Sequence, residues 1–489
     1  MGFNLPDTSI IPRYTAIVGD TRLERGGGSG WAHIYPANGK VTTELQLAGV
    51  ADVEAAVAAA RAALPGWRAG SSEIRRDLLL KLADAIEATA AELAALDTLG
   101  NGYPAMMAAY TPGVMAQRFR YYAGWADKIR GETLDAWNGP AHSYVNYEPY
   151  GVVGAIIPWN GPLFAAAMVL APALAAGNCV VIKAPELAPF SVMRLAQLFA
   201  EVGFPPGVVN MVCGGADVGE AIVASSGVDK VQFVGSGNTA KRVLQTAAQT
   251  LKPCGLELGG KSAVLVFDDA NLQEAAKLGL SGAVSVSGQG CVNGTRVLVQ
   301  RSIYDQFIAM AQVMAGHISL GDPLLPTTVM GPLISAQSLA RIEGIVARAQ
   351  AEGARLVCGG ERAGGDFADG FYMPLTLFAD VDPNSALSQH EVFGPVLAIT
   401  PFDDEDEAIA IANGTDYGLG AYIHSQNLRR AHTVAAQMQA GTVQVNTAGG
   451  GMQPYAPFGG YKQSGYGRLG GEQGLLEFLQ VKSVWMNLA

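Results

Sequence analysis

A lone cysteine flanked by small residues is the strongest candidate for covalent chemistry in this sequence. Cys291 follows Gly290, and residues 281–288 before it read Ser-Gly-Ala-Val-Ser-Val-Ser-Gly. Small neighbours leave room around a sulfur atom, and a thiolate attacks carbonyl carbon readily near neutral pH. Most free cysteines, however, are simply small buried apolar residues. Cys291 alone therefore leaves both interpretations open, and the rest of the chain must decide between them.

A second stretch, residues 255–262, has the spacing of a phosphate-binding loop but the wrong surroundings. It reads Gly-Leu-Glu-Leu-Gly-Gly-Lys-Ser and satisfies the pattern Gly-x-x-x-x-Gly-Lys-Ser. A P-loop must open a helix, whereas residues 263–267 predict a strand, and the Glu257 carboxylate would repel phosphate. We therefore exclude nucleotide hydrolysis at this stretch, which leaves Glu257 to be explained.

The elements that would position these residues alternate between strands and helices. Strands are predicted over residues 152–157, 180–183, 208–212, 230–234 and 255–258, with helices over 163–176, 191–202, from 218 onward and over 239–250. This order predicts a parallel sheet with helices on both faces and ligands at the carboxyl ends of its strands. The motif Gly-x-Gly-x-x-Gly is missing. Gly235 and Ser236 nevertheless lie between a strand and a helix, where backbone N–H groups could meet a pyrophosphate.

The flanking parts read as scaffold. Residues 53–130 predict Ala-rich helices that break at Pro65-Gly66 and at residues 100–102, and the Gly-rich residues 26–30 predict a turn. After Cys291, a second α/β segment is expected to about residue 446, with helices at 304–317, 336–352 and 405–413 and strands near Thr376 and Val396. Residues 478–485 predict an apolar edge strand, which usually pairs with another strand, for example in a second subunit.

Residues 149–182 carry no charged side chain, a run long enough to cross a bilayer. Pro158, Pro162 and Pro172 interrupt the run, and a spanning helix seldom carries so many breakers. We therefore predict a strand, a helix and a second strand here instead of a membrane helix.

Composition narrows the function classes. Of 489 residues, 49% are hydrophobic and 15% charged, as expected for a large globular enzyme of two or three domains. A net charge of −11 without a basic cluster argues against nucleic acid and anionic membranes as partners. The five cysteines are scattered without metal-ligand spacing, which favours free thiols in a reducing compartment and no metal site. The N-terminus lacks a signal-peptide pattern, so we expect a cytoplasmic location.

Several stretches together resemble the aldehyde dehydrogenase superfamily over essentially the whole chain. They are Pro158-Trp159-Asn160, Lys183-Ala184-Pro185-Glu186, residues 233–236 and 256–262, Gly288-Gln289-Gly290-Cys291, residues 391–395 and residues 457–460. The resemblance implies an α/β fold with a Rossmann-like cofactor domain (1–130 and 151–258), an α/β catalytic domain (259–455) and a small oligomerisation β-sheet (131–150 and 470–489). It also implies a homodimer or homotetramer.

The resemblance gives the candidate residues complementary roles. Cys291 would attack an aldehyde carbonyl to form a thiohemiacetal, and the Asn160 amide with the Cys291 backbone N–H would stabilise the oxyanion. Hydride transfer to NAD would leave a thioester, and Glu257 would activate the water that hydrolyses it. Structural interpretations remain for two of them, a turn residue for Asn160 and a satisfied buried carboxylate for Glu257.

The cofactor residues implied by the resemblance surround the same sheet edge. Glu186 near the adenosine ribose would repel a 2′-phosphate and so favour NAD over NADP, although Lys183 could partly offset this effect. Glu391 would bind the nicotinamide ribose, and Phe393 would pack against the ring. The full predicted set is Ile156, Ile157, Pro158, Trp159, Lys183, Glu186, Gly215, Gly219, Phe233, Gly235, Ser236, Leu258, Gly259, Glu391 and Phe393.

Some positions depart from the family pattern. Val169 and Leu469 replace a lysine and a glutamate that many members carry and that are thought to pair in a proton path, so we infer that this path is lost. His390 stands where an acidic residue is common, and the sequence gives no reason for it.

The predicted substrate pocket is wide and apolar. Gly161 replaces a bulky aromatic residue that relatives often carry, and residues 448–452 at the expected tunnel mouth are mostly glycine. With Phe164, Met168, Tyr455 and Phe458 nearby, we predict a hydrophobic or aromatic aldehyde. No arginine is clearly placed to hold a substrate carboxylate.

Two other functions remain to be tested. In a CoA-acylating enzyme CoA would resolve the thioester, but a water-activating Glu257 would waste that intermediate. In a catalytically silent binding protein we would expect Cys291, Glu257 or Asn160 to be replaced, and all three are present.

Overall fold

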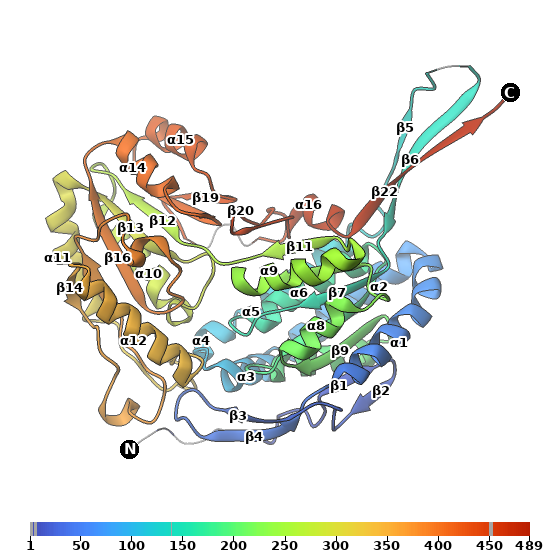
Figure 1. Ribbon diagram of the computed structural model, residues 1–489, viewed down its shortest axis with the longest axis horizontal. Coiled ribbons are helices and arrows are strands. Elements are labelled where there is room, and N and C mark those ends of the chain that lie inside the picture. Colours follow the sequence, from blue (N-terminus) through green and yellow to red (C-terminus); the bar gives the residue numbers. More distant parts are fainter. Residues whose placement is uncertain (1–2, 4–6, 138, 449–452) are drawn as a thin grey trace.

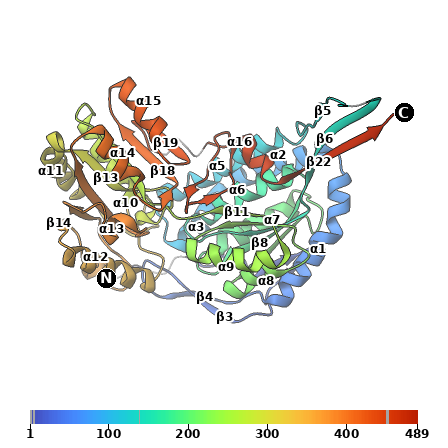
Figure 2. The same ribbon diagram turned by 45° about the horizontal axis from the view of Figure 1, so that its top comes forward.

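The computed structural model describes residues 3, 7–137, 139–448 and 453–489. The chain forms two α/β units, each around its own sheet, and a β-arm that extends from the first unit (Figure 1). Figure 2 shows the same arm, ending in the C-terminal strand, projecting from the body in a second view. The α/β class predicted from the sequence is confirmed.

The first sheet has a core of five parallel strands. Its order is β2-β1-β9-β8-β7-β10-β11-β21, in which β1 and β21 are antiparallel to their neighbours β9 and β11. The parallel strands are β7 (Val152–Ile156), β8 (Cys179–Pro185), β9 (Val209–Gly214), β10 (Lys230–Val234) and β11 (Cys254–Glu257). The chain order runs outward from β7 in one direction and from β10 in the other, so the topological switch point lies between these two strands. Ligands bind at such a point in open α/β sheets.

The sequence predicts the crossover helices of this sheet to within three residues at each end that it gives. They are α6 (Pro162–Ala175), α7 (Phe190–Glu201), α8 (Ala216–Ala224) and α9 (Gly237–Ala247). The charge-free run forms β7, α6 and β8 as predicted, and no helix within the described part of the chain is long and apolar enough to span a membrane. These apolar runs are buried because helices cover both faces of the sheet.

The N-terminal region surrounds the first sheet. Its strands are β1 (Ala16–Val18), β2 (Thr21–Leu23), β3 (Gly30–Ile34) and β4 (Val41–Gln46), and its helices are α1 (Val50–Ala69), α2 (Ser72–Ala88), α3 (Ala90–Asn101), α4 (Ala105–Ala108) and α5 (Thr111–Ala123). Residues 26–30 lie between β2 and β3, as predicted. Helix α3 ends at Gly102, whose φ of 75° suits a C-terminal glycine.

The predicted helix break at Pro65-Gly66 is wrong. Helix α1 continues through both residues to Ala69. Trp67 in its last turn is 3% exposed, and its ring centroid lies 5.7 Å from that of Phe204. Tertiary packing of this side chain therefore overrides the cost of proline inside the helix.

The second unit is built on a seven-stranded sheet of order β14-β15-β16-β13-β12-β18-β19. Its strands are β12 (Ser262–Val266), β13 (Gly294–Gln300), β14 (Arg355–Cys358), β15 (Thr376–Ala379), β16 (Val396–Phe402), β18 (Gly420–His424) and β19 (Thr442–Val445). Its helices are α10 (Leu272–Val284), α11 (Tyr304–Ala315), α12 (Ala336–Ala351), α13 (Ala386–Gln389), α14 (Glu405–Asn413) and α15 (Leu428–Gln437). Lys261 and Ser262 lead into strand β12, so the rejection of a P-loop is confirmed.

The C-terminal segment returns to the first unit and then enters the arm. Short strands β17 (Tyr417–Gly418), β20 (Tyr461–Lys462) and β21 (Gly465–Tyr466) precede helix α16 (Gly471–Leu476). The arm is a sheet of order β22-β6-β5, with β5 (Glu132–Leu134), β6 (Ala141–Pro149) and β22 (Leu479–Asn487). Strand β22 is an edge strand, as predicted. The division into three domains with the boundaries given above stays a prediction.

Candidate active site

The three predicted catalytic residues lie at the carboxyl ends of strands in the first sheet or beside them. Glu257 is the last residue of β11, Asn160 follows β7, and Cys291 comes after α10. The Asn160 amide Nδ2 donates a 2.7 Å hydrogen bond to the carbonyl of Gln289, two residues before the cysteine. A Cβ built on Gly260, three residues after Glu257, would lie 2.5 Å from the Cys291 carbonyl oxygen. The structure thus brings the three segments together.

The segment before Cys291 has an unusual backbone. Val286 and Ser287 have φ values of 51° and 53°, and Gly288 has φ 74°. A built Cβ on Gly288 would collide with Gly394, so only glycine fits there. Gln289 locks the turn, because its Nε2 donates to Val286 O (3.1 Å) and its Oε1 accepts from Ile334 N (3.0 Å). Left-handed non-glycine residues cost energy and persist only where surrounding structure enforces them, which is common at functional sites.

Cys291 is a weakly acidic thiol in this environment. Burial, together with the nearby carboxylates Glu391 and Glu257, raises its pKa to about 12. Its thiolate is therefore scarce at neutral pH unless a base or a positive charge assists. Only the thiolate is nucleophilic, so loss of the thiol proton is part of any reaction at this residue.

Glu257 has the properties expected of a general base. Its side chain is 4% exposed, and neither carboxylate oxygen has a hydrogen-bond partner among the described residues. Burial raises its pKa well above the ordinary 4.5, the nearby Arg468 guanidinium lowers it, and Glu477 raises it. Burial thus makes this carboxylate a better proton acceptor near neutral pH and leaves its oxygens available to water.

Glu391 and Phe393 approach the site from the second unit. Gly260 N donates to Glu391 Oε1 at 3.1 Å, and a built Cβ on Gly259 would collide with the same carboxylate. Burial raises the Glu391 pKa to about 7. The Phe393 ring stands edge-on to Trp159, with centroids 5.5 Å apart and planes at 88°. This contact joins the Trp159 loop of the first unit to the second unit.

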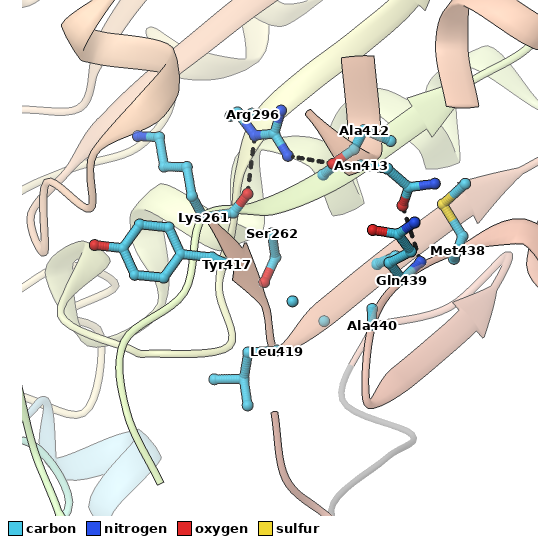
Figure 3. Close-up of a pocket in the computed structure, with 14 residues that line it drawn as sticks. Lys261, Ser262, Arg296, Ala412, Asn413, Tyr417, Leu419, Met438, Gln439 and Ala440 are labelled. Atoms are coloured by element: carbon cyan, nitrogen blue, oxygen red, sulfur yellow. Dashed lines mark hydrogen bonds between the residues drawn. The ribbon is translucent and has the colours of Figure 1, made fainter. Parts of the chain in front are cut away.

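The buried Arg296 guanidinium, close to the buried Lys261, fixes the loop that follows Glu257 (Figure 3). The Arg296 guanidinium donates to the carbonyls of Lys261 (2.8 Å), Ile411 (2.8 Å) and Ala412 (2.7 Å). Burial and the nearby Arg296 lower the Lys261 pKa to about 7, against an opposing effect of Glu391. The cavity beside them has about 10 Å³, enough for one water at most. Arg296 therefore holds the backbone of this loop, and the cavity is too small for a substrate pocket.

Most predicted cofactor residues line one cleft at the switch point. The cleft has a volume of about 340 Å³, and its lining includes Ile156, Ile157, Pro158, Trp159, Lys183, Glu186, Gly215, Gly219, Phe233, Gly235 and Ser236. Leu258, Gly259, Glu391 and Phe393 lie outside this lining. Leu258 N donates to Ser464 O (3.0 Å), which ties the loop after β11 to the C-terminal segment.

The cleft fits a dinucleotide. Gly215 and Ser236 are the N-terminal caps of α8 and α9, so the free backbone N–H groups of two helices begin at its wall. Such groups suit a pyrophosphate. The Lys183 ammonium lies 3.1 Å from Glu186 Oε2 at the same wall. A carboxylate there can accept hydrogen bonds from ribose hydroxyls, and its partner lysine already compensates part of its charge.

Three of the predicted substrate residues lie at the start of helix α6, and the other two lie in the C-terminal segment. Gly161, Phe164 and Met168 have helical spacing at the start of α6, and a built Cβ on Gly161 would meet no atom within 4 Å. Phe458 is 5% exposed and packs in the main core, whereas Tyr455 is 64% exposed. The predicted tunnel mouth at 448–452 falls largely on residues 449–452, outside the described part of the chain.

Sequence reasoning missed Arg118 in α5. It is 2% exposed, and its guanidinium lies 5.4 Å from the centroid of the Phe164 ring. A Cβ built on Gly470, next to Leu469, would lie 3.6 Å from Arg118 Nη1. Nothing in the local sequence of α5 indicates this contact, because Arg118 and Phe164 lie 46 positions apart along the chain.

Two of the three departures from the family pattern are buried apolar residues. Val169 and Leu469 are both 0% exposed and belong to the same core cluster. A charged pair at these positions is thus replaced by apolar packing. His390 is exposed and faces the carboxylate of Glu352.

Comparison with known proteins places these features in context. Residues 24–484 match the aldehyde dehydrogenase family. An aldehyde dehydrogenase of Emericella nidulans is 43% identical over 93% of this chain and 91% of its own length. Human retinal dehydrogenase 2 is 39% identical over 99% of this chain and 94% of its own length.

Solved structures agree with the sequence comparison. The crystal structure of betaine aldehyde dehydrogenase from Staphylococcus aureus in complex with NAD+ has a TM-score of 0.95 and 36% identity. The match covers 98% of this chain and 95% of that one. Relatives of comparable identity are thus named after chemically different aldehydes, so the similarity does not identify the substrate.

Proposed function

This chain belongs to the aldehyde dehydrogenase family and oxidises an aldehyde, and we propose that it does so with NAD, by way of a thioester on Cys291. The observation that carries this proposal is the 2.7 Å hydrogen bond from the Asn160 amide to Gln289 O. It holds an N–H donor beside the cysteine, at the same edge of the sheet at which Glu257 ends β11. Nucleophile, oxyanion donor and base thus occupy one place.

The chemistry follows from these residues. The Cys291 sulfur bonds to the aldehyde carbon, and the carbonyl oxygen takes the negative charge. One N–H of the Asn160 amide holds Gln289, and the second N–H with the Cys291 backbone N–H stabilises that oxyanion. NAD, when bound, supplies the hydride acceptor. Glu257 then takes a proton from a water whose oxygen bonds to the thioester carbon; the carbon–sulfur bond breaks, and the carboxylic acid leaves.

NAD is favoured over NADP by the Lys183–Glu186 pair. The lysine ammonium is held by the carboxylate at 3.1 Å, so it is not free to bind a 2′-phosphate. The carboxylate side chain is 26% exposed and can still accept a ribose hydroxyl. Solved relatives with NAD+ bound support the same preference.

Asn160→Ala tests the oxyanion donor. We expect kcat to fall by about 10²- to 10³-fold, because one preorganised hydrogen bond to the developing charge is lost. Rapid mixing with NAD and aldehyde should show that the first NADH burst, which reports hydride transfer, slows by this factor. NAD affinity should stay near the wild-type value. The isosteric Asn160→Asp should be at least as slow, since a carboxylate repels the oxyanion; an unchanged burst rate in both variants would contradict this role.

The substrate proposed here is a hydrophobic or aromatic aldehyde. The support is the helix face of Gly161, Phe164 and Met168, where the missing side chain of Gly161 opens onto empty space. Neighbouring apolar side chains favour an apolar ligand through burial of its surface.

Gly161→Phe tests the width of this pocket. We expect kcat/KM for a bulky aromatic aldehyde to fall about 10- to 100-fold, because the added ring occupies the space of the substrate. For acetaldehyde, kcat/KM should change less than about threefold, since a small aldehyde needs no such space. Steady-state NADH formation with both substrates measures the difference. Equal losses for both aldehydes would show that the pocket lies elsewhere.

Arg118 favours a second candidate, an aldehyde whose far end carries a carboxylate. Its permanent positive charge lies against the Phe164 ring, and the charge would repel a cationic aldehyde. A semialdehyde with the lowest KM of a panel would support this candidate and contradict the purely apolar one. Arg118→Met should then raise that KM and leave the KM of benzaldehyde unchanged.

The direct test of function follows NADH formation by the wild type with NAD or NADP, with and without CoA. Acid formation without CoA supports the proposal. A strict need for CoA would indicate an acylating enzyme, and a lack of turnover with every aldehyde would indicate a binding protein.

The arm supports assembly with a second copy of the chain. Trp137, Val481, Trp485 and Leu488 are each more than half exposed on or beside its strands. Large apolar side chains so exposed favour burial in an interface. A homodimer or homotetramer is therefore proposed. The predicted cytoplasmic location is supported by the five free cysteines.

A further inference from the structure

The proton that Glu257 takes up must leave the buried site, and the structure offers one polar route. Helix α6 gives none, because Val169 is an apolar residue of the core. Residues of β10, of the loop after β21 and of the segment after α16 do carry polar side chains that the proposed reaction does not use.

The pairing of β10 with β11 shows which position lies on the same face as Glu257. Gln232 pairs with Gly255, and Val234 pairs with Glu257, along the parallel strands β10 and β11. Side chains two residues apart point to the same face of a strand. Gly255, which lacks a side chain, therefore leaves an open position on the face that carries Glu257.

The Glu477 carboxylate fills that position. A Cβ built on Gly255 would lie 2.8 Å from Glu477 Oε1, and one on Gly467 would lie 2.9 Å from Glu477 Oε2. A Cβ on Gly459 would lie 2.8 Å from Glu257 Oε1 and 2.7 Å from the Gly467 carbonyl oxygen. The two carboxylates thus approach the same glycine-lined space beside Gly467, where one water can accept a hydrogen bond from one carboxyl group and donate to the other.

Exposure to solvent rises from Glu257 to Glu477, as a proton exit requires. Glu257 is 4% exposed, whereas the Glu477 side chain is 17% exposed. Lys230 Nζ binds Glu477 Oε1 at 2.7 Å and is itself 3% exposed, so it holds the carboxylate in place. Gln232 Oε1, which also faces Gly255, has no hydrogen-bond partner among the described residues and can accept from a bridging water.

We propose that Glu477 is the proton acceptor that returns Glu257 to its carboxylate form after each hydrolysis, through a bridging water beside Gly467. The Glu257 carboxyl donates its proton to the water, which passes one of its own protons to Glu477, and Glu477 releases that proton to solvent. No electrons move, and both carboxylates end the cycle deprotonated. The titratable groups that face Glu477 are Lys230, Tyr150, Tyr466 and Glu257.

This inference rests on the proposed function, because it concerns hydrolysis of the Cys291 thioester. Glu477→Gln keeps the shape of the side chain and its ability to accept from Lys230, and removes its capacity to carry the proton. Glu477→Asp restores a carboxylate. Glu472→Gln changes an exposed glutamate of the same helix α16 and serves as the matched control.

The experiment follows two steps after rapid mixing of the full-length protein with NAD and a good aldehyde. The NADH burst reports hydride transfer and the fraction of correctly folded sites, and intact-protein mass spectrometry of quenched samples reports loss of the acyl group. For Glu477→Gln we expect an unchanged burst and acyl loss slowed about tenfold, less than removal of the base itself would cause. Imidazole added at fixed pH and ionic strength should restore the rate, and Glu477→Asp and Glu472→Gln should lie near wild type.

Acyl loss at the wild-type rate in Glu477→Gln would overturn the inference. So would a slow rate that imidazole does not restore, or a loss of burst and acyl turnover together, because both indicate a purely structural ion pair. A wild-type protein without any NADH burst would overturn the proposed function itself, and the relay with it.

Discussion

Replacement of Cys291 by alanine is expected to abolish NADH formation. The variant has no sulfur to bond to the aldehyde carbon, so hydride transfer has no thiohemiacetal to start from, and kcat should fall on the order of 10⁴-fold or more. The measurement is NADH absorbance with saturating NAD and aldehyde, against the same concentration of wild-type protein.

Two controls make the Cys291 result specific. Cys358→Ala changes a partly buried thiol on β14, far along the chain from the site, and should keep wild-type turnover. NAD binding to Cys291→Ala, measured by calorimetry, should also be retained, since the thiol is not in the cofactor cleft. Turnover above one per cent of wild type in Cys291→Ala would exclude this residue as the nucleophile.

Glu257→Gln is expected to separate the two halves of the reaction. Hydride transfer needs no water, so the variant should still give a burst of about one NADH per site. Hydrolysis should then slow by about 10²- to 10⁴-fold, because the amide cannot accept a proton from water. Rapid-mixing absorbance followed into the steady state measures both phases.

The pH profile of the wild type provides a second test of Glu257 as the general base. Burial raises its pKa above 4.5, and a base works only when it is deprotonated. Hydrolysis should therefore be lost as pH falls through that raised pKa, at a pH higher than an exposed glutamate would give. In Glu257→Gln the residual hydrolysis should lack this acid limb. The same limb in the variant would assign it to another group, such as Glu391, whose pKa is raised to about 7.

Much of the fold could be predicted because its parallel sheets are buried on both faces. Strands such as β7 (Val152–Ile156) are continuous apolar runs. The prediction for β10 (Lys230–Val234) matches the structure residue for residue. The candidate catalytic residues could be found because each lies in a short motif. Helix α10 (Leu272–Val284) was not predicted. Its end is a run of small residues, which equally fits an open loop around Cys291.

Contacts between distant parts of the chain could not be predicted. Lys230 and Glu477 are 247 residues apart, and their ion pair depends on how the C-terminal segment returns to β10 and β11. Arg118 reaches Phe164 only because α5 packs on α6. No arginine could be placed near the predicted substrate residues from the sequence for this reason, and the substrate proposal includes a carboxylate-bearing alternative because of this packing.

The most direct test of the proposed thioester on Cys291 is to locate the acyl group. Glu257→Gln should be mixed with aldehyde, with and without NAD, then quenched in acid and digested, and its peptides analysed by mass spectrometry. We predict an acyl mass on the peptide that contains Cys291, close to one per protein chain, only when NAD is present. An acyl group on another residue, or none while NADH forms, would contradict the proposed thioester mechanism.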